Sequence, residues 1–475
     1  MARFRRVDLL AAHQCARRLW LQSRPGEGER AGPRADDRDM VRVAARRRFP
    51  GGVAVDQRAA VAERVAQTWA LLERPEVPAI FDATMVYADV VVRCAILARV
   101  AGGFVVVEAK SANSVGEAHE LDVAASAWVA ERAGVPIVGR QLLHLDGNYV
   151  RGAELDEQAL FSVVNVPAHD FAAAAAKLAA LDVCEPEIAV GLHCTRPREC
   201  PWRDHCAPRK DTPTSVHRLP RGGKLAQDLA GLGIDDVRDI PRDVRLNPSQ
   251  QHAVWALLHD REYIGQGLAP ALRNVRWPLR FLDFEACQPA VPRWPETSPF
   301  QQVPTQWSMH VEHADGRVEH LEFLHDTDSD PREPFVRSLV EACGSEGSIV
   351  VYSGYEANTL RGLRDRIPEA WADLEGLVGR IWDLLPAVRD HYYHPALDGS
   401  FSIKAVLPAV CPHLDYRDLR IADGMTAAAA WLRMIGPRTP PEERAVTRAD
   451  LLAYCARDTL AMLEVRKALV ARSGG

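Results

Sequence analysis

Acidic side chains recur in the C-terminal half of the chain at spacings that bring carboxylates together. Asp283 and Glu285 alternate with apolar residues in RFLDFEA, so both point to one face of the expected strand. Glu356 follows the apolar run SIVVYS. In LLAYCARDTLAML, Tyr454 and Asp458 lie four residues apart, on one face of the expected helix. Two acids on an otherwise apolar strand are costly unless a divalent cation offsets their charge.

This set of residues suits phosphodiester hydrolysis by two metal ions about 3.5–4 Å apart, which activate a water and stabilise the leaving oxygen. Mg²⁺ and Mn²⁺ prefer oxygen ligands, which accounts for carboxylates in place of His or Cys. The ordered set resembles the DEDD exonucleases of the RNase H-like fold, in their Tyr subtype. The resemblance implies that Asp283, Glu285, Glu356 and Asp458 hold Mg²⁺ or Mn²⁺ and that Tyr454 orients the attacking water. Glu356 departs from the family pattern, which has Asp at this motif.

Two more residues could belong to the same site. GSFSIKAVLP resembles the Ser-Leu-Lys stretch of RNase D-like enzymes, which makes Lys404 a candidate contact to a substrate phosphate. The chain has only six lysines, so a lysine inside a motif carries extra weight, because its compact charge differs from the arginine fork. Asp383, in RIWDLL, is more typical of a helix N-cap than of a metal ligand.

Cysteines form a second group of candidate ligands. Cys194, Cys200 and Cys206 are six residues apart in HCTRPRECPWRDHC, and Cys15 lies about 180 residues upstream of the first of them. Four such thiolates are typical of an iron–sulfur or other metal site that joins the two ends of a domain. Zinc is the alternative, because a histidine precedes both Cys194 and Cys206. A third alternative is that the thiols are buried without a metal.

This arrangement resembles the iron–sulfur members of the RecB-type PD-(D/E)XK nucleases, which implies a 4Fe-4S cluster on the four cysteines. FVVVEAK supplies Glu108 and Lys110 on one strand face, matching the family's Glu-x-Lys, in which Glu binds the metal and Lys positions water. The match then breaks. Ala95 stands where the preceding strand should carry a metal-binding Asp, and the following helix lacks the expected Gln and Tyr. Unless Asp82 or Asp122 reaches the site, we expect an impaired nuclease fold that still holds DNA.

The elements that must position these residues indicate two domains and a connector. Residues 1–210 mix helical patterns with a strand pair that turns at 101–103, and residues 211–278 change to short helical pieces. Residues 279–475 open with a strand, continue into a hairpin that turns at Asp315-Gly316, and end in helices. We expect an α/β protein: a restriction-endonuclease-like N-terminal domain with a Cys-ligated metal cluster, and an RNase H-like C-terminal domain with a mixed sheet.

Length and composition limit the alternatives. The chain has 475 residues, 47% hydrophobic and 26% charged, which excludes collagen-like, mostly disordered and disulfide-miniprotein classes. Its net charge of −6 excludes a nucleic-acid-binding protein whose whole surface is basic. The first fifty residues nevertheless contain thirteen arginines, which suit phosphate binding. Neither a signal peptide nor a run of about 20 apolar residues is visible, so we expect a cytoplasmic protein that does not bind membranes.

Together these patterns predict a two-metal-ion nuclease. The resemblance to DEDD exonucleases implies 3′–5′ digestion of single-stranded nucleic acid by the C-terminal domain, with DNA favoured over RNA. Two alternatives stay open: cleavage by the RecB-like domain, and a non-catalytic iron–sulfur scaffold that binds nucleic acid. Because the chain has no helicase motif, a helicase or a repair or defence protein is a candidate partner.

Overall fold

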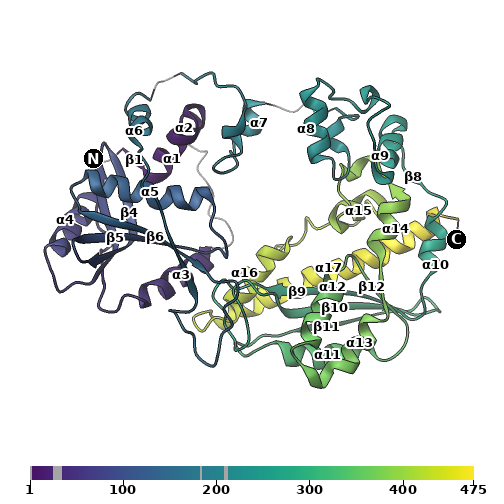
Figure 1. The fold of residues 1–475 in the computed structure, drawn as a ribbon. Coiled ribbons are helices and arrows are strands. Elements are labelled where there is room, and N and C mark those ends of the chain that lie inside the picture. The colour runs from purple at the N-terminus through teal and green to yellow at the C-terminus, as the bar shows by residue number, and fades with distance from the viewer. Residues whose placement is uncertain (1–2, 25–34, 182–183, 208–211, 475) are drawn as a thin grey trace. The chain divides into compact units, whose positions relative to one another are not determined.

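The structure is a computed structural model that describes residues 3–24, 35–181, 184–207 and 212–474 (Figure 1). The chain forms two compact units. The first unit comprises Met1–Arg209 and Pro289–Gln301, and the second comprises Lys210–Gln288 and Gln302–Gly475. The expected boundary at 210/211 lies outside the described residues.

The first unit is built on a seven-stranded mixed sheet with helices on both faces. Its strands are β1 Phe4–Arg5, β2 Val53–Ala54, β3 Ala79–Tyr87, β4 Val90–Val100, β5 Gly103–Lys110, β6 Ile137–Leu145 and β7 Phe161–Asn165. Its helices are α1 Arg6–Gln14, α2 Ala16–Gln22, α3 Ala35–Arg47, α4 Val61–Leu72, α5 Glu117–Arg132, α6 Ala172–Ala179 and α7 Arg203–Cys206, with a 3₁₀ turn η1 at Leu192–Cys194. The strand order is β2-β3-β4-β5-β6-β7, and β1 pairs with β4.

The expected strand pair in the first unit is confirmed. β4 and β5 are antiparallel and turn at 101–103, where Gly102 has a positive φ of 84°. β5 then pairs in parallel with β6, and the intervening helix α5 packs on the sheet. Apolar side chains of α1, α4 and α5 fill the core on one face, and those of α3 fill the core on the other.

The second unit contains a five-stranded mixed sheet in the order β11-β10-β9-β12-β13 and a small pair of β14 with β8. Its strands are β8 Tyr263–Ile264, β9 Leu279–Cys287, β10 Val303–Glu312, β11 Val318–Leu324, β12 Ser348–Val351, β13 Ile381–Asp383 and β14 Tyr392–Tyr393. Its helices are α8 Gly223–Gly231, α9 Pro248–His259, α10 Leu268–Arg273, α11 Arg332–Cys343, α12 Tyr355–Arg364, α13 Trp371–Val378, α14 Leu384–His391, α15 Ile403–Val410, α16 Gly424–Met434 and α17 Pro441–Arg472. Four 3₁₀ turns complete it: η2 Val216–Arg218, η3 Val237–Asp239, η4 Pro368–Ala370 and η5 Pro395–Leu397.

The two faces of this sheet differ in polarity. Leu282 and Phe284 of β9 point into an apolar core shared with α11, α12 and α13. The long helix α17 packs against β9 and β10, and it runs along the sheet in Figure 1. A hydrogen bond from the Gln306 amide on β10 to the Leu451 carbonyl fixes α17 to the strands at 2.9 Å. The mixed sheets with covering helices confirm the expected α/β class in both units.

Two segments belong to different units from those expected from the sequence. Residues 211–278, expected as a separate connector, lie in the second unit, because β8 pairs with β14 and the Tyr392 hydroxyl donates to Glu262 at 2.8 Å. The loop Pro289–Gln301, expected within the C-terminal domain, lies in the first unit. Burial explains this second difference, since Ala290 and Val291 belong to the apolar core beneath α3. In the described parts of the chain we found no helix with the length and apolarity to cross a bilayer.

Candidate functional site

Three carboxylates of the second unit converge on the polar face of the sheet. Asp283 and Glu285 on β9 and Asp458 on α17 each offer an oxygen, and these atoms lie within 4.8 Å of one another. Among the described residues this is the one group of three or more potential metal ligands. The prediction that the two strand acids share a face is confirmed, because their neighbours Leu282 and Phe284 occupy the apolar core.

Glu356 approaches the same group from the first turn of α12. Its side chain is buried, and one of its oxygens, Oε2, is buried without a hydrogen-bond partner. Burial raises the pKa of Glu356 to about 8, and the charges of Asp383 and Asp458 act in the same direction. An ionised carboxylate with an unsatisfied buried oxygen needs a cation or a proton.

The carboxylates raise one another's pKa values. Burial is the main cause for Asp283, whose pKa lies well above its usual range, and the charges of Asp458, Glu356 and Glu285 add to it. Burial and Asp458 raise the pKa of Glu285 to about 8, while Lys404 opposes the shift. Asp283 and Glu285 remain half-buried, so the cluster is open to ligands from solvent. The cluster fits Mg²⁺ or Mn²⁺, because all of its donor atoms are oxygens and it carries excess negative charge. The unpartnered oxygen of Glu356 is a further ligand of the kind that these ions prefer.

Tyr454 and Lys404 form a linked pair beside the carboxylates. The Lys404 ammonium donates to the Tyr454 hydroxyl at 2.8 Å and to the Ala422 carbonyl at 2.6 Å. Burial and then the Asp458 charge raise the pKa of the Tyr454 phenol, so this group keeps its proton. Because Lys404 stays half-buried, its charge is within reach of a bound anion. Asp383 is the N-cap of α14, as expected, and accepts from the Leu385 and Ser353 amides at 2.9 Å each.

Three further residues at the site escaped the sequence analysis. The Tyr416 hydroxyl donates to Asp458 Oδ1 at 2.6 Å. The Cys455 thiol lies 3.6 Å from Asp283 Oδ2. Asp423 caps α16 by accepting from the Thr426 amide at 2.9 Å, and its charge contributes to the raised pKa of Glu285. The Asp-x-x-Thr spacing could have predicted that cap, but nothing local marks Tyr416, which lies in a loop.

In the first unit, Glu108 and Lys110 share a strand face but hold different partners. The Arg6 guanidinium donates to Glu108 Oε1 at 2.8 Å and to Ser126 Oγ at 2.9 Å. Lys110 donates to Asp122 Oδ2 at 2.6 Å, so Asp122 reaches the site from α5. Basic side chains therefore already neutralise both acids.

Asp122 is one of the two acids whose arrival at this site would overturn the expectation of an impaired nuclease fold, but in the structure its nearest partner there is Lys110. Asp82 pairs with Arg46 on α3. The buried Cys94 thiol, the neighbour of Ala95, lies near Glu108, and burial together with that carboxylate raises its pKa to about 12. The group that β4 places near Glu108 is therefore a thiol, whereas the resemblance to RecB-type nucleases implies an aspartate on this strand.

The structure brings the four candidate cysteines toward one another. The Gln14 amide, adjacent to Cys15, donates to the His193 carbonyl at 2.6 Å, which ties the end of α1 to the late cysteine segment. The Cys200 amide donates to the Cys194 carbonyl at 2.8 Å. Burial, followed by the charges of neighbouring thiols, raises the pKa of Cys200 and of Cys206. All four are free thiols.

Comparison with known proteins adds one finding. No curated protein and no solved structure matches the chain. The family described as Domain of unknown function (DUF2779) matches residues 280–402, a segment that contains Asp283, Glu285 and Glu356 and ends before Lys404, Tyr454 and Asp458.

Proposed function

We propose that the protein is a two-metal-ion nuclease whose second unit digests single-stranded nucleic acid from its 3′ end. The observation that carries this proposal is the convergence of Asp283, Glu285 and Asp458 within 4.8 Å, from a strand and from a helix distant in sequence. Carboxylates gathered on a half-buried face keep their charge only where a cation offsets it, and otherwise take up protons. The unpartnered Glu356 oxygen supports the same requirement.

In this proposal the four carboxylates hold Mg²⁺ or Mn²⁺, which supply an activated water and stabilise the leaving oxygen. The Tyr454 hydroxyl, anchored by Lys404, stays protonated and orients that water. Lys404 adds a positive charge beside the acids, which favours approach of a phosphate. Tyr416 holds Asp458 in place through its 2.6 Å hydrogen bond.

The finer assignments rest on the resemblance of the motifs to DEDD exonucleases and to RecB-type nucleases. It supports an RNase H-like second unit, a restriction-endonuclease-like first unit, 3′–5′ polarity and a preference for DNA. It also supports a 4Fe-4S cluster on Cys15, Cys194, Cys200 and Cys206, with zinc as the alternative. We propose that the protein acts in the cytoplasm with a helicase or a repair or defence protein as partner.

The test is digestion of end-labelled single-stranded DNA and RNA by the full chain purified without oxygen. We expect Mg²⁺ or Mn²⁺ to support stepwise shortening from the 3′ end and a chelator to stop it. Asp283→Asn should reduce the rate by more than about 100-fold, because it removes a metal ligand. Digestion that survives both the chelator and Asp283→Asn refutes the proposal.

A second candidate is cleavage by the first unit, favoured by the ion pair between Lys110 and Asp122. Against it stands the Arg6 guanidinium, which occupies the Glu108 carboxylate. Glu108→Gln in the same digestion assay separates the two candidates. If the second unit is the nuclease, this variant digests DNA at the wild-type rate.

A further inference from the structure

The loop Pro289–Gln301 connects the strand that carries two acids of the metal site to the next strand of the sheet. It continues β9, which ends at Cys287, and leads into β10, which begins at Val303. Glu285 lies four residues before the loop. Both strands belong to the second unit, whereas the loop belongs to the first. The hairpin that supplies Glu285 is therefore held at its connecting end by the first unit.

One residue of the first unit, Arg151, binds both halves of this loop. Arg151 is half-buried and lies between β6 and β7. Its Nη1 donates to the Pro292 carbonyl at 2.8 Å. Its backbone amide donates to the Thr297 carbonyl at 2.9 Å, and its carbonyl accepts from the Glu296 amide at 2.8 Å. Three hydrogen bonds to one residue fix a type of segment that in most proteins is mobile and exposed.

The loop has a closed neck and a buried interior. The Phe300 amide donates to the Pro289 carbonyl at 3.1 Å, which holds the two ends of the loop together. Val291 lies in the apolar core beneath α3. Thr297 is 1% exposed, and its hydroxyl donates to the Trp294 carbonyl at 2.6 Å. Because a closely packed segment has few alternative arrangements, the loop should move together with Arg151.

Glu285 lies at an irregular point of the hairpin. The pairing of β9 with β10 shifts between Pro304 and Gln306, so Thr305 is an extra residue beside the partner of Glu285. The Thr305 hydroxyl donates to the Glu285 carbonyl at 3.3 Å. A bulge interrupts the regular ladder and changes the direction of nearby side chains. The ladder alone therefore leaves the orientation of Glu285 incompletely fixed.

We propose that Arg151 is a positioning residue for the metal site: it holds the loop Pro289–Gln301, the loop sets the position of Glu285, and the first unit thereby controls metal affinity in the second. A metal ligand must be held to within about 0.5 Å of its productive position. Binding of a metal should in turn stabilise the contacts of Arg151, because coupling is reciprocal. That a divalent metal binds there rests on the proposed function, whereas the contacts of Arg151 lie within the first unit.

The experiment compares full-length Arg151→Ala with the wild type. The variant loses the bond to the Pro292 carbonyl, and we expect Mn²⁺ affinity, measured by calorimetry, to fall about fivefold or more. In chelator, amide hydrogen exchange of β9 and β10 should become faster, because the connecting end of the hairpin is released. Arg151→Lys keeps a donor for the same carbonyl and should restore part of both properties.

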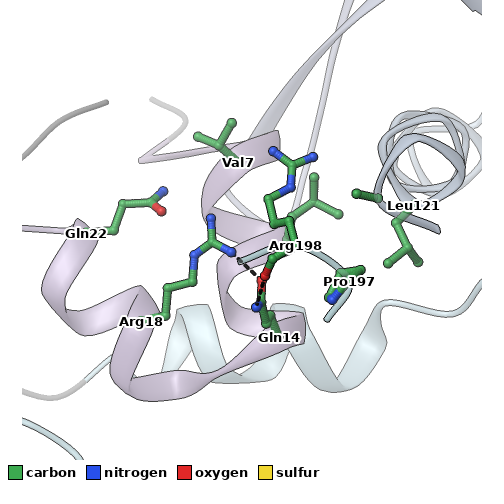
Figure 2. A pocket seen from close by; sticks show the side chains of 9 residues that line it. Val7, Gln14, Arg18, Gln22, Leu121, Pro197 and Arg198 are labelled. Atoms are coloured by element: carbon green, nitrogen blue, oxygen red, sulfur yellow. Dashed lines mark hydrogen bonds between the residues drawn. The ribbon is translucent and has the colours of Figure 1, made fainter. Parts of the chain in front are cut away.

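Gln14→Ala is the matched control. The Gln14 side chain also makes hydrogen bonds inside the first unit, to the His193 and Arg198 carbonyls at 2.6 and 2.8 Å. Figure 2 shows Gln14 beside Arg198, and neither carbonyl belongs to the loop Pro289–Gln301. This variant should lower the unfolding temperature of the first unit but leave Mn²⁺ affinity and the exchange of β9 and β10 unchanged.

An insertion separates the loop from the strand. Two glycines placed between Gln288 and Pro289 keep the contacts of Arg151 and all four acids but add flexible chain between them. The insertion should weaken Mn²⁺ binding as much as Arg151→Ala does. Because both changes break the same connection, the combined variant should bind Mn²⁺ no more weakly than either one alone.

Two results would overturn this role of Arg151. The first is unchanged exchange of β9 and β10 in folded Arg151→Ala. The second is a loss of Mn²⁺ affinity that Gln14→Ala shares or that adds to the effect of the insertion, since either would indicate general destabilisation. If the wild type binds no Mn²⁺, the proposed function fails, and the exchange of β9 and β10 alone decides whether Arg151 positions the hairpin.

Discussion

Replacing Glu285 by Gln should stabilise the metal-free protein while weakening metal binding. The pKa of Glu285 is raised from its usual 4.5 to about 8, so the folded state favours the protonated acid. At pH 7 the unfolded chain carries this acid ionised, and the difference destabilises the fold by about 3 kcal/mol. Because Glu285 is half-buried and neighbouring acids can take up the proton, we expect Gln to recover about 1–3 kcal/mol.

The sign of the effect fixes its pH dependence. A group whose pKa is raised on folding contributes stability that is complete below the unfolded pKa and is lost as pH rises toward the folded value. Metal-free wild-type protein should therefore lose stability between pH 4.5 and 8, and Glu285→Gln should lose less. The two proteins should unfold at equal temperatures at pH 4 and differ by roughly 2–10 °C at pH 7.

The assay is thermal unfolding of the full chain in chelator and with Mn²⁺, across this pH range. Mn²⁺ should stabilise the wild type more than the variant, because it binds only the intact fold and the variant lacks one ligand. Glu322→Gln, at an exposed glutamate on β11 outside the cluster, is the matched control and should have little effect. If Glu285→Gln lowers the unfolding temperature in chelator at pH 7, or changes it equally at pH 4 and 7, the carboxylates do not form a repulsive cluster.

Three further predictions test other parts of the structure. Tyr416→Phe removes the hydrogen bond to Asp458 and should weaken Mn²⁺ binding, measured by calorimetry, about tenfold. The unfolding temperature should change by no more than a few degrees. An unchanged Mn²⁺ affinity would refute the role of Tyr416 in positioning Asp458. Cys200→Ser should abolish bound iron, measured by metal analysis of protein purified without oxygen, whereas Cys343→Ser in the second unit should not. Val291→Asp places a charge in the core beneath α3 and should lower the free energy of unfolding of the first unit by about 2–5 kcal/mol, measured in denaturant. If Pro289–Gln301 were a solvated loop, this variant would be as stable as the wild type.

The parts of the site that could be predicted are those encoded by local periodicity. Alternation along β9 placed Asp283 and Glu285 on one face, and the four-residue spacing placed Tyr454 beside Asp458 on α17, because both patterns follow from backbone geometry alone. The apolar run before Glu356 likewise forms a strand, β12, and Glu356 lies in the first turn of the helix that follows, α12. None of these required knowledge of a distant contact.

The parts that could not be predicted depend on long-range packing. Tyr416 reaches Asp458 across 42 residues from a loop without regular pattern. Arg6 reaches Glu108 across 102 residues, and nothing near either residue marks the pair. The loop Pro289–Gln301 is rich in proline and polar groups, so its composition suggests a surface segment, yet Val291 completes an apolar core. Burial at such positions is a property of the assembled unit, which no single segment encodes.

The two acid groups of this chain differ in how their charge is balanced, and that difference predicts a division of labour. In the first unit Arg6 and Lys110 bind Glu108 and Asp122 directly, so those acids need no ion. A guanidinium balances charge but cannot activate water as a metal does, so such a site positions ligands without hydrolysing them. In the second unit the acids outnumber the cations, and burial together with neighbouring carboxylates raises the pKa values of Asp283, Glu285 and Glu356. Of these two acid groups in the described residues, the second is the one whose charge a divalent metal would balance, and we therefore propose that the hydrolysis takes place there.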